Sequence, residues 1–90
     1  MMVSMPLELG QLVYSKRGRD RGTAYIVVGM FIESGKLYAL LADGSKRMAE
    51  KPKKKKSMHI QPTNTVIPYD NKADAGALNA YIRGILETRG

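Results

Sequence analysis

Short runs of β-branched, aromatic and aliphatic residues, separated by glycine-rich or charged segments, occupy the first two thirds of the chain. Residues 9–14 place Leu12 and Tyr14 on one face of an extended segment. Residues 23–32 are too rich in Val and Ile for a helix, and Gly29 among them indicates a β-bulge or a tight bend. We predict a strand over each run, with the second as the central strand.

Two turns are predicted next. Residues 33–36 form a glycine-containing hairpin loop before a third strand over residues 37–42. This strand ends at Asp43-Gly44, the dipeptide favoured in type I′ turns, and residues 45–49 are predicted as a short fourth strand. Successive hairpins imply a meander.

The following segment is dominated by lysine. Residues 50–57 contain Pro52 and like charges that repel, so we predict an exposed loop. Residues 58–61 are predicted as a strand that closes a barrel, and residues 62–64 as a turn that leads to residues 66–68.

A different period begins at Asn71, which is placed to act as an N-cap. The apolar positions at helical spacing are Ala77, Leu78, Tyr81, Ile82, Ile85 and Leu86. Gly76 and Gly84 each lower helix propensity by about 1 kcal/mol relative to Ala, so this helix depends on tertiary contact. The apolar stripe either packs on the barrel or docks on a partner, and burial favours packing.

Composition limits the functions to consider. Ninety residues support one core, and the absence of Cys excludes disulfides and thiolate metal sites. The chain has a single His, scattered acidic residues and no phosphate-loop signature, so we expect no catalysis, no cofactor and no metal. Without an apolar run of about 20 residues or a secretory signal, we expect a soluble cytoplasmic protein with no membrane contact.

Charge is concentrated in one region. Residues 16–56 contain twelve basic and four acidic residues, whereas the net charge of the whole chain is +7. Such asymmetry is typical of a protein that binds a polyanion, although it also serves solubility.

Two basic segments are candidate contact sites. In residues 16–22, Gly18 and Gly22 would let backbone amides approach a phosphate, among four cationic side chains. The alternative is a solvated turn in which Asp20 pairs with a neighbouring Arg. The lysines of residues 51–56 suit a phosphate backbone without reading bases; the alternatives are a solubilising loop, a nuclear import signal or a membrane-surface patch.

Aromatic residues and the histidine are less informative. We assign Tyr14, Tyr25 and Tyr38 to structure, because a Tyr in a strand more often fills the core than stacks on a base. The alternative is an outward Tyr beside the basic loop that serves as a stacking platform. His59 either contacts RNA beside the lysine run or is a strand residue.

The pattern G-x-L-V-x-S-K-x-G-R-D-x-G-x-x-Y-I-V-V, which starts at Gly10, resembles the KOW motif of ribosomal proteins and transcription elongation factors, with Gly22 at the hallmark position. The order of S-K-R-G-R-D-R-G, L-Y-A-L-L-A-D-G, K-P-K-K-K-K and M-H-I is similar to KOW-containing large-subunit ribosomal proteins of archaea and eukaryotes and their small bacterial relatives. This resemblance implies an SH3-like barrel that contacts rRNA through residues 16–21 and 51–56.

We therefore expect a mainly β protein: an SH3-like (KOW) five-stranded barrel over residues 8–67, with a C-terminal amphipathic α-helix over residues 70–88 packed on it. The expected function is binding of structured rRNA by a monomeric ribosomal or ribosome-associated protein in translation, with ribosomal proteins as further partners. The alternative is an SH3-like protein-interaction module with solubilising basic loops. The residues expected to contact RNA are Lys16, Arg17, Gly18, Arg19, Arg21, Gly22, Lys46, Arg47, Lys51, Lys53, Lys54, Lys55, Lys56 and His59.

Overall fold

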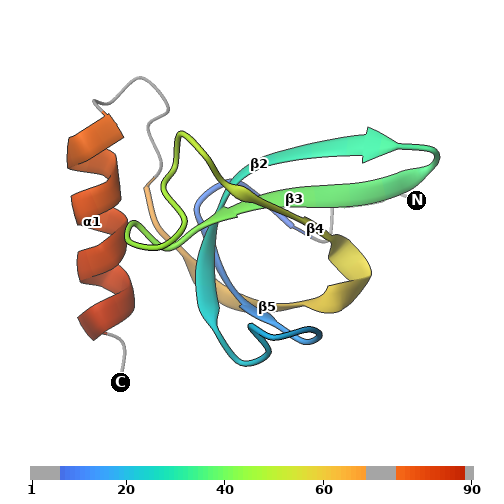
Figure 1. Ribbon diagram of the computed structural model, residues 1–90, viewed down its shortest axis with the longest axis horizontal. Coiled ribbons are helices and arrows are strands. Elements are labelled where there is room, and N and C mark those ends of the chain that lie inside the picture. The colour runs from blue at the N-terminus through green and yellow to red at the C-terminus, as the bar shows by residue number, and fades with distance from the viewer. Residues whose placement is uncertain (1–6, 69–74, 89–90) are drawn as a thin grey trace.

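Five strands form one antiparallel sheet, and a C-terminal helix lies beside it (Figure 1). The computed structural model describes residues 7–68 and 75–88. The elements are β1 (Gln11–Ser15), β2 (Ala24–Glu33), β3 (Lys36–Ala42), β4 (Lys53–Lys56), a 3₁₀ turn η1 (Ser57–His59), β5 (Ile60–Val66) and α1 (Ala75–Thr88). The strand order is β4-β3-β2-β1-β5. The prediction of a mainly β chain with a C-terminal helix is confirmed.

β2 is the central strand, as predicted. It pairs with β1 on one side and with β3 on the other, and its register with β3 shifts between Val27 and Gly29. This shift is the predicted bulge at Gly29. A Cβ at this position would lie 2.9 Å from Cδ1 of Leu40, which explains why the bulge carries a glycine.

The hairpin between β2 and β3 turns through Ser34 and Gly35, whose φ angles are 52° and 76°. Two successive positive φ angles are typical of a type I′ turn, whose twist matches that of the flanking strands. The sequence placed this turn type at Asp43-Gly44 instead, which is wrong: Gly44 has φ 77°, but Asp43 is not among the residues with positive φ.

The apolar side chains form two clusters on opposite faces of the sheet. Along β2, Tyr25 and Val27 belong to one cluster, and Ala24 and Ile26 belong to the other. α1 completes the second cluster by burying Leu78 and Ile82 against the sheet. The start of β2 is therefore buried on both faces, which explains its continuous apolar sequence.

Three predictions for the middle of the chain are wrong. Residues 45–49 form no strand but belong to an irregular connection. The segment predicted as an exposed lysine loop contains β4, which pairs with β3 from Lys53 to Lys56. A strand forms there because the edge of β3 is available for pairing and because Lys53 and Lys55 form salt bridges with Asp20.

The third correction concerns the closing strand. Residues 57–59 form η1, so β5 begins only at Ile60 and continues through residues 62–64, where a turn was predicted. Within the described ladders, β5 is an edge strand that pairs only with β1. Pro62 is tolerated there because the edge of β5 that faces away from β1 forms no ladder hydrogen bonds, so a proline without an N–H removes none on that edge.

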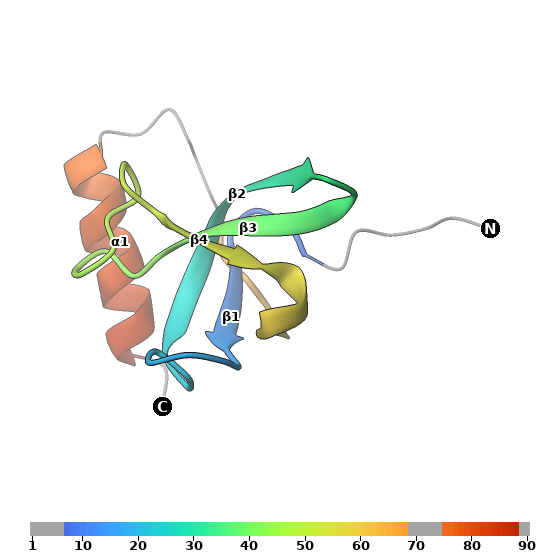
Figure 2. The same cartoon turned by 45° about the vertical axis from the view of Figure 1, so that its right-hand side comes forward.

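The sheet is strongly curled, and η1 links its two edge strands, β4 and β5 (Figures 1 and 2). Asn71, the predicted N-cap, lies outside the described residues. No helix in the described part of the chain is long and apolar enough to cross a bilayer.

Candidate nucleic-acid interface

The Asp20 carboxylate is the centre of a hydrogen-bond network on the first loop, defined as residues 16–23 between β1 and β2. Its Oδ1 accepts hydrogen bonds from Ser15 Oγ and Lys55 Nζ, both at 2.9 Å. Its Oδ2 accepts one from the Tyr25 hydroxyl at 2.9 Å and forms a salt bridge of 2.8 Å with Lys53 Nζ. The network therefore joins the first loop to β1, β2 and β4.

These contacts determine the protonation states of the Asp20 carboxylate and the Tyr25 hydroxyl. Burial alone would raise the pKa of Asp20, but the hydrogen bonds from Lys53, Lys55, Ser15 and Tyr25 outweigh burial and hold this pKa well below its ordinary value. Burial and the adjacent Asp20 carboxylate raise the pKa of Tyr25 to about 12. Asp20 is therefore a fixed negative charge, and Tyr25 a fixed donor, at neutral pH.

Backbone geometry in the first loop requires its two glycines. Gly18 and Gly22 have φ angles of 87° and 88°, which side-chain-bearing residues rarely adopt. The Gly22 amide donates to the Ser15 carbonyl oxygen at 2.8 Å, so this amide has a partner within the loop. Gly22 thus shapes the backbone of the loop.

Those cations are exposed. Lys16, Arg17, Arg19 and Arg21 are all solvent-accessible. The alternative in which Asp20 pairs with a neighbouring Arg is wrong, because the salt bridges of Asp20 go to lysines of β4. The loop therefore has an internally neutralised centre and a cationic outer surface.

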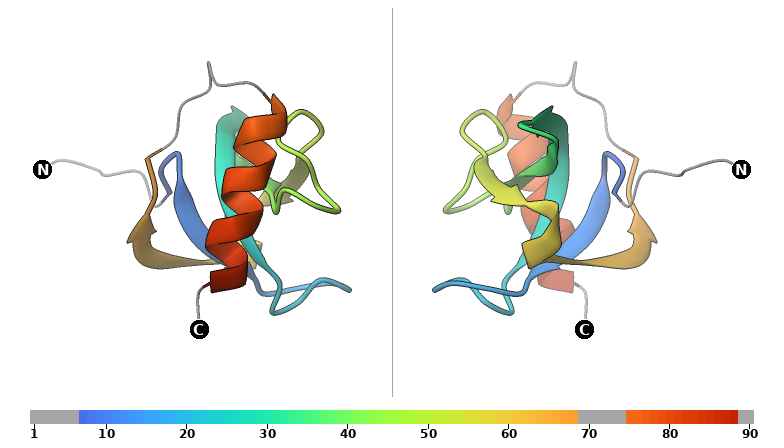
Figure 3. Two further views of the ribbon diagram at one scale, coloured as in Figure 1. Left: turned by 90° about the vertical axis from the view of Figure 1, so that its left-hand side faces the viewer. Right: turned by 90° about the vertical axis from the view of Figure 1, so that its right-hand side faces the viewer.

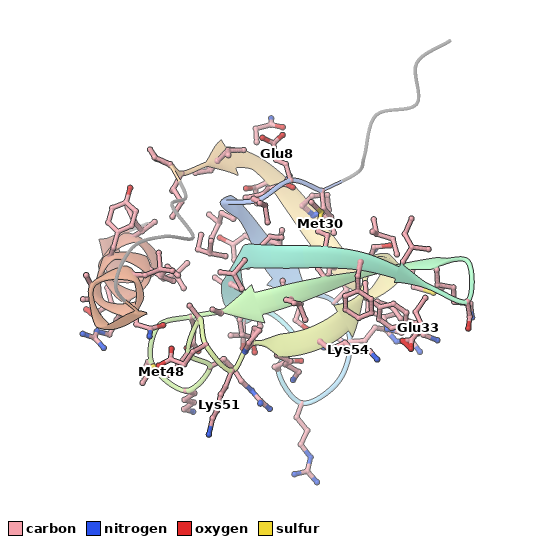
Figure 4. All side chains as sticks on the ribbon, turned by 90° about the horizontal axis from the view of Figure 1, so that it is seen from above. Glu8, Met30, Glu33, Met48, Lys51 and Lys54 are labelled. Atoms are coloured by element: carbon pink, nitrogen blue, oxygen red, sulfur yellow. The ribbon has the colours of Figure 1, made fainter. Side chains whose placement is uncertain are left out.

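The lysines of β4 alternate between two faces, as strand geometry requires. Lys53 and Lys55 turn toward Asp20, and only 10% of the Lys55 side chain is exposed. Lys54 points to the other face, where its Nζ lies 3.2 Å from Oε1 of Glu33 (Figure 4). Of the predicted contact residues in this strand, only Lys56 has no salt bridge to a described carboxylate.

Lys54 also covers an aromatic pair. The rings of Phe31 and Tyr38 stack with centroids 5.3 Å apart and an interplanar angle of 8°. The Lys54 ammonium lies 4.8 Å from the Tyr38 centroid and 5.4 Å from that of Phe31. Cation–π contact of this kind stabilises the outer face of the sheet. Tyr25 is buried in the core and Tyr38 packs on the sheet, in agreement with their assignment to structure.

The β3–β4 connection, residues 43–52, carries further cations. Asp43 Oδ1 accepts hydrogen bonds from the amides of Ser45 and Arg47 at 2.8 and 2.9 Å, which fixes the start of this connection. Lys46, Arg47 and Lys51 are exposed on it. In Figure 4, Lys51 lies on the side nearer α1, whereas Lys54 lies nearer the β2–β3 hairpin.

α1 holds this connection in place. Arg83 Nη1 donates to the Gly44 carbonyl oxygen at 3.1 Å. The buried Asn79 accepts from the Ala49 amide at 2.7 Å and donates to Glu50 Oε1 at 2.7 Å. Sequence reasoning missed Asn79, although a polar residue within the apolar stripe of a helix is a detectable signal of such a contact.

The first loop and the β3–β4 connection project to the same side of the molecule (Figure 3). Residues of both segments line one hollow of about 250 Å³. We call it the basic hollow. Arg19, Lys46, Arg47 and Lys53 line it together with Asp20 and Asp43. The structure thus brings together four predicted contact residues from three segments of the chain.

His59 lies beside the first loop. Its carbonyl oxygen accepts a hydrogen bond from the Lys16 amide at 2.9 Å. Desolvation and the nearby charges of Arg17, Lys56, Lys55 and Lys16 lower the pKa of the His59 imidazole from 6.5. It is therefore mainly neutral at neutral pH.

Neither a protein-family model nor a curated protein sequence matches this chain.

Proposed function

We propose that this protein is a non-catalytic RNA-binding domain whose fold is an SH3-like barrel of the KOW type. The observation that carries the proposal is the convergence of the first loop and the β3–β4 connection, with their exposed cations, on the basic hollow. Arg19, Lys46 and Arg47 come from distant parts of the sequence, and their proximity concentrates positive potential on one surface.

The strand arrangement supports the barrel. The order β4-β3-β2-β1-β5, the strong curl of the sheet and the short link η1 between the two edge strands are what a small five-stranded barrel requires. The KOW-like pattern covers β1, the first loop and the start of β2, and its hallmark glycine is Gly22, whose φ is 88°.

The cations also favour RNA over an apolar partner. Arg side chains grip phosphates with two hydrogen bonds and stack on unpaired bases, whereas Lys contributes charge. Structured RNA, recognised by shape and phosphate contacts, fits a basic surface whose loops are held by hydrogen bonds to the sheet and to α1. The resemblance to ribosomal KOW proteins makes rRNA the proposed target, in a ribosomal or ribosome-associated role in the cytoplasm.

Binding to a structured RNA fragment, followed by fluorescence anisotropy over a range of salt concentrations, tests the proposal. We expect the triple variant Arg17→Gln, Arg19→Gln, Arg21→Gln to bind more weakly and to lower the slope of log K against log salt by about one for each phosphate that it no longer neutralises. Lys36→Gln, in the distant β2–β3 hairpin, is the control and should retain the slope. Unchanged affinity and slope in the triple variant would contradict the proposal.

A second candidate function has one observation in its favour. Ile32 and Met58 are 67% and 65% exposed, and Met58 and Leu37, the cross-strand neighbour of Ile32, line a hollow of about 180 Å³. This patch favours a protein-interaction module. A shallow salt dependence of partner binding and sensitivity to Met58→Gln would support that function instead.

A further inference from the structure

We infer that the basic hollow is a binding site for one phosphate group of the bound RNA, a specific contact within the otherwise diffuse positive surface. The inference rests on the proposed function and deepens it. Three features of the hollow carry it: the balance of charge, the rigidity of both walls, and the available hydrogen-bond donors.

The charge in the hollow is positive once its internal hydrogen bonds and salt bridges are considered. Four cationic side chains line it against two carboxylates. Asp20 is neutralised by Lys53 and by Lys55, and four donors surround it. Asp43 Oδ1 already accepts two backbone amides. Both oxygens of Asp20 and one oxygen of Asp43 therefore accept internal donors, which reduces the repulsion of an anion.

Three of the four cations are not paired with a carboxylate of the described residues. Arg19, Lys46 and Arg47 are exposed, and none forms a salt bridge with a carboxylate of the described residues. Their charges lie around one concave surface, where the potential of like charges adds and counterions concentrate. A phosphate that enters can contact two Arg side chains and one Lys.

Both walls of the hollow are held before any ligand arrives. The first-loop wall is fixed by the Asp20 network and by the amide of Thr23, which donates to the Asp20 carbonyl oxygen at 2.8 Å. The opposite wall is fixed by Asp43 and by Arg83 of α1. A preformed site loses less conformational entropy on binding than a loop that must fold around its ligand.

Size and donors also fit a phosphate group. The hollow has a volume of about 250 Å³, so a phosphate group has room in it. The exposed Thr23 borders the hollow, and its hydroxyl is a further donor for a phosphate oxygen. In this arrangement α1 acts as a positioning element, because it fixes the wall that presents Lys46 and Arg47.

Amide chemical shifts of the full chain during titration with inorganic phosphate, against chloride at equal ionic strength, test the site. We expect saturable shifts centred on Arg19, Thr23, Lys46 and Arg47. The variant Lys46→Gln, Arg47→Gln should abolish saturation, whereas the charge-matched variant Lys16→Gln, Arg17→Gln should retain it. Retained dispersion of the remaining amide signals shows that each variant is folded.

RNA binding by the wild type and by the Lys46→Gln, Arg47→Gln variant separates this inference from the proposed function. We expect Lys46→Gln, Arg47→Gln to lose about tenfold in RNA affinity. RNA binding by the wild type, together with non-saturable phosphate shifts, would overturn the inference and leave the proposed function standing. Saturable phosphate shifts without any RNA binding would overturn the proposed function and assign the hollow to free phosphate.

Discussion

Lys55 Nζ lies 2.9 Å from Oδ1 of Asp20, and this contact joins the edge strand β4 to the loop that follows β1. Both side chains are largely buried, with exposed fractions of 10% and 13%. A lysine from the most basic run of the sequence therefore serves to organise the first loop. The cations left exposed around it are those we propose to contact RNA.

Loss of the Asp20 carboxylate should destabilise the protein. Asp20→Asn removes the negative charge between Lys53 and Lys55, and we expect a loss of about 2–3 kcal/mol in the free energy of unfolding, measured with urea. The control Glu33→Gln removes a salt bridge in which about half of each side chain is exposed, and should cost less than about 1 kcal/mol. Equal effects of the two substitutions would contradict the structural role of Asp20.

Acid should destabilise the protein through the same carboxylate. The pKa of Asp20 is lower in the folded state than its ordinary value of 3.8, so its stabilising contribution is complete above that value and is lost as the pH falls toward the folded pKa. Urea unfolding at a series of pH values from about 6 to about 2 should show a steeper decrease for the wild type below pH 3.8 than for Asp20→Asn. Parallel curves would mean that the folded-state pKa of Asp20 is not lowered.

Gly44 should be sensitive to any side chain. Its φ is 77°, and a Cβ would collide with the Asn79 carbonyl oxygen and lie 2.9 Å from the Arg83 amide nitrogen, both in α1. Gly35→Ala is a matched control, because Gly35 has φ 76° and open space around it. We expect about 1–2 kcal/mol of destabilisation from backbone strain at Gly35, and a larger loss at Gly44 because α1 must also shift. Similar losses of stability at both positions would show that α1 can shift away from residue 44 without loss of stability.

RNA affinity should rise on mild acidification because of His59. Desolvation and the charges of Arg17, Lys56, Lys55 and Lys16 keep the imidazole pKa below 6.5 in the free protein. A nearby phosphate would favour the protonated form, so RNA binding takes up a proton and strengthens as the pH decreases below about 6.5. His59→Gln should remove this part of the pH dependence in anisotropy measurements from about pH 7.5 to about 5.5. An identical dependence in the variant would place His59 outside the interface.

The sequence predicted the elements that depend on local pattern. Continuous apolar character identified β2, and Gly29 within it identified the bulge, because both signals reflect burial and steric limits at those positions. The exposed cations of the first loop were also predictable, since two glycines without any apolar residue exclude a packed element.

The elements that depend on distant contacts were not predictable in this way. Four consecutive lysines form β4 because Lys53 and Lys55 meet Asp20 across the fold, and repulsion considered within the segment alone omits that partner. Pro62 lies in a strand because β5 is at the edge of the sheet, which only the topology reveals. The basic hollow likewise depends on how α1 holds the β3–β4 connection through Asn79 and Arg83.

Ribosome co-sedimentation of the protein from its own cells at low and high salt, with RNA crosslinking of the bound fraction, tests the central claim most directly. We expect association that weakens at high salt, and crosslinks to rRNA from residues 16–21 and from Lys46 and Arg47. The absence of both ribosome association and crosslinked RNA would contradict the account and favour the protein-interaction module.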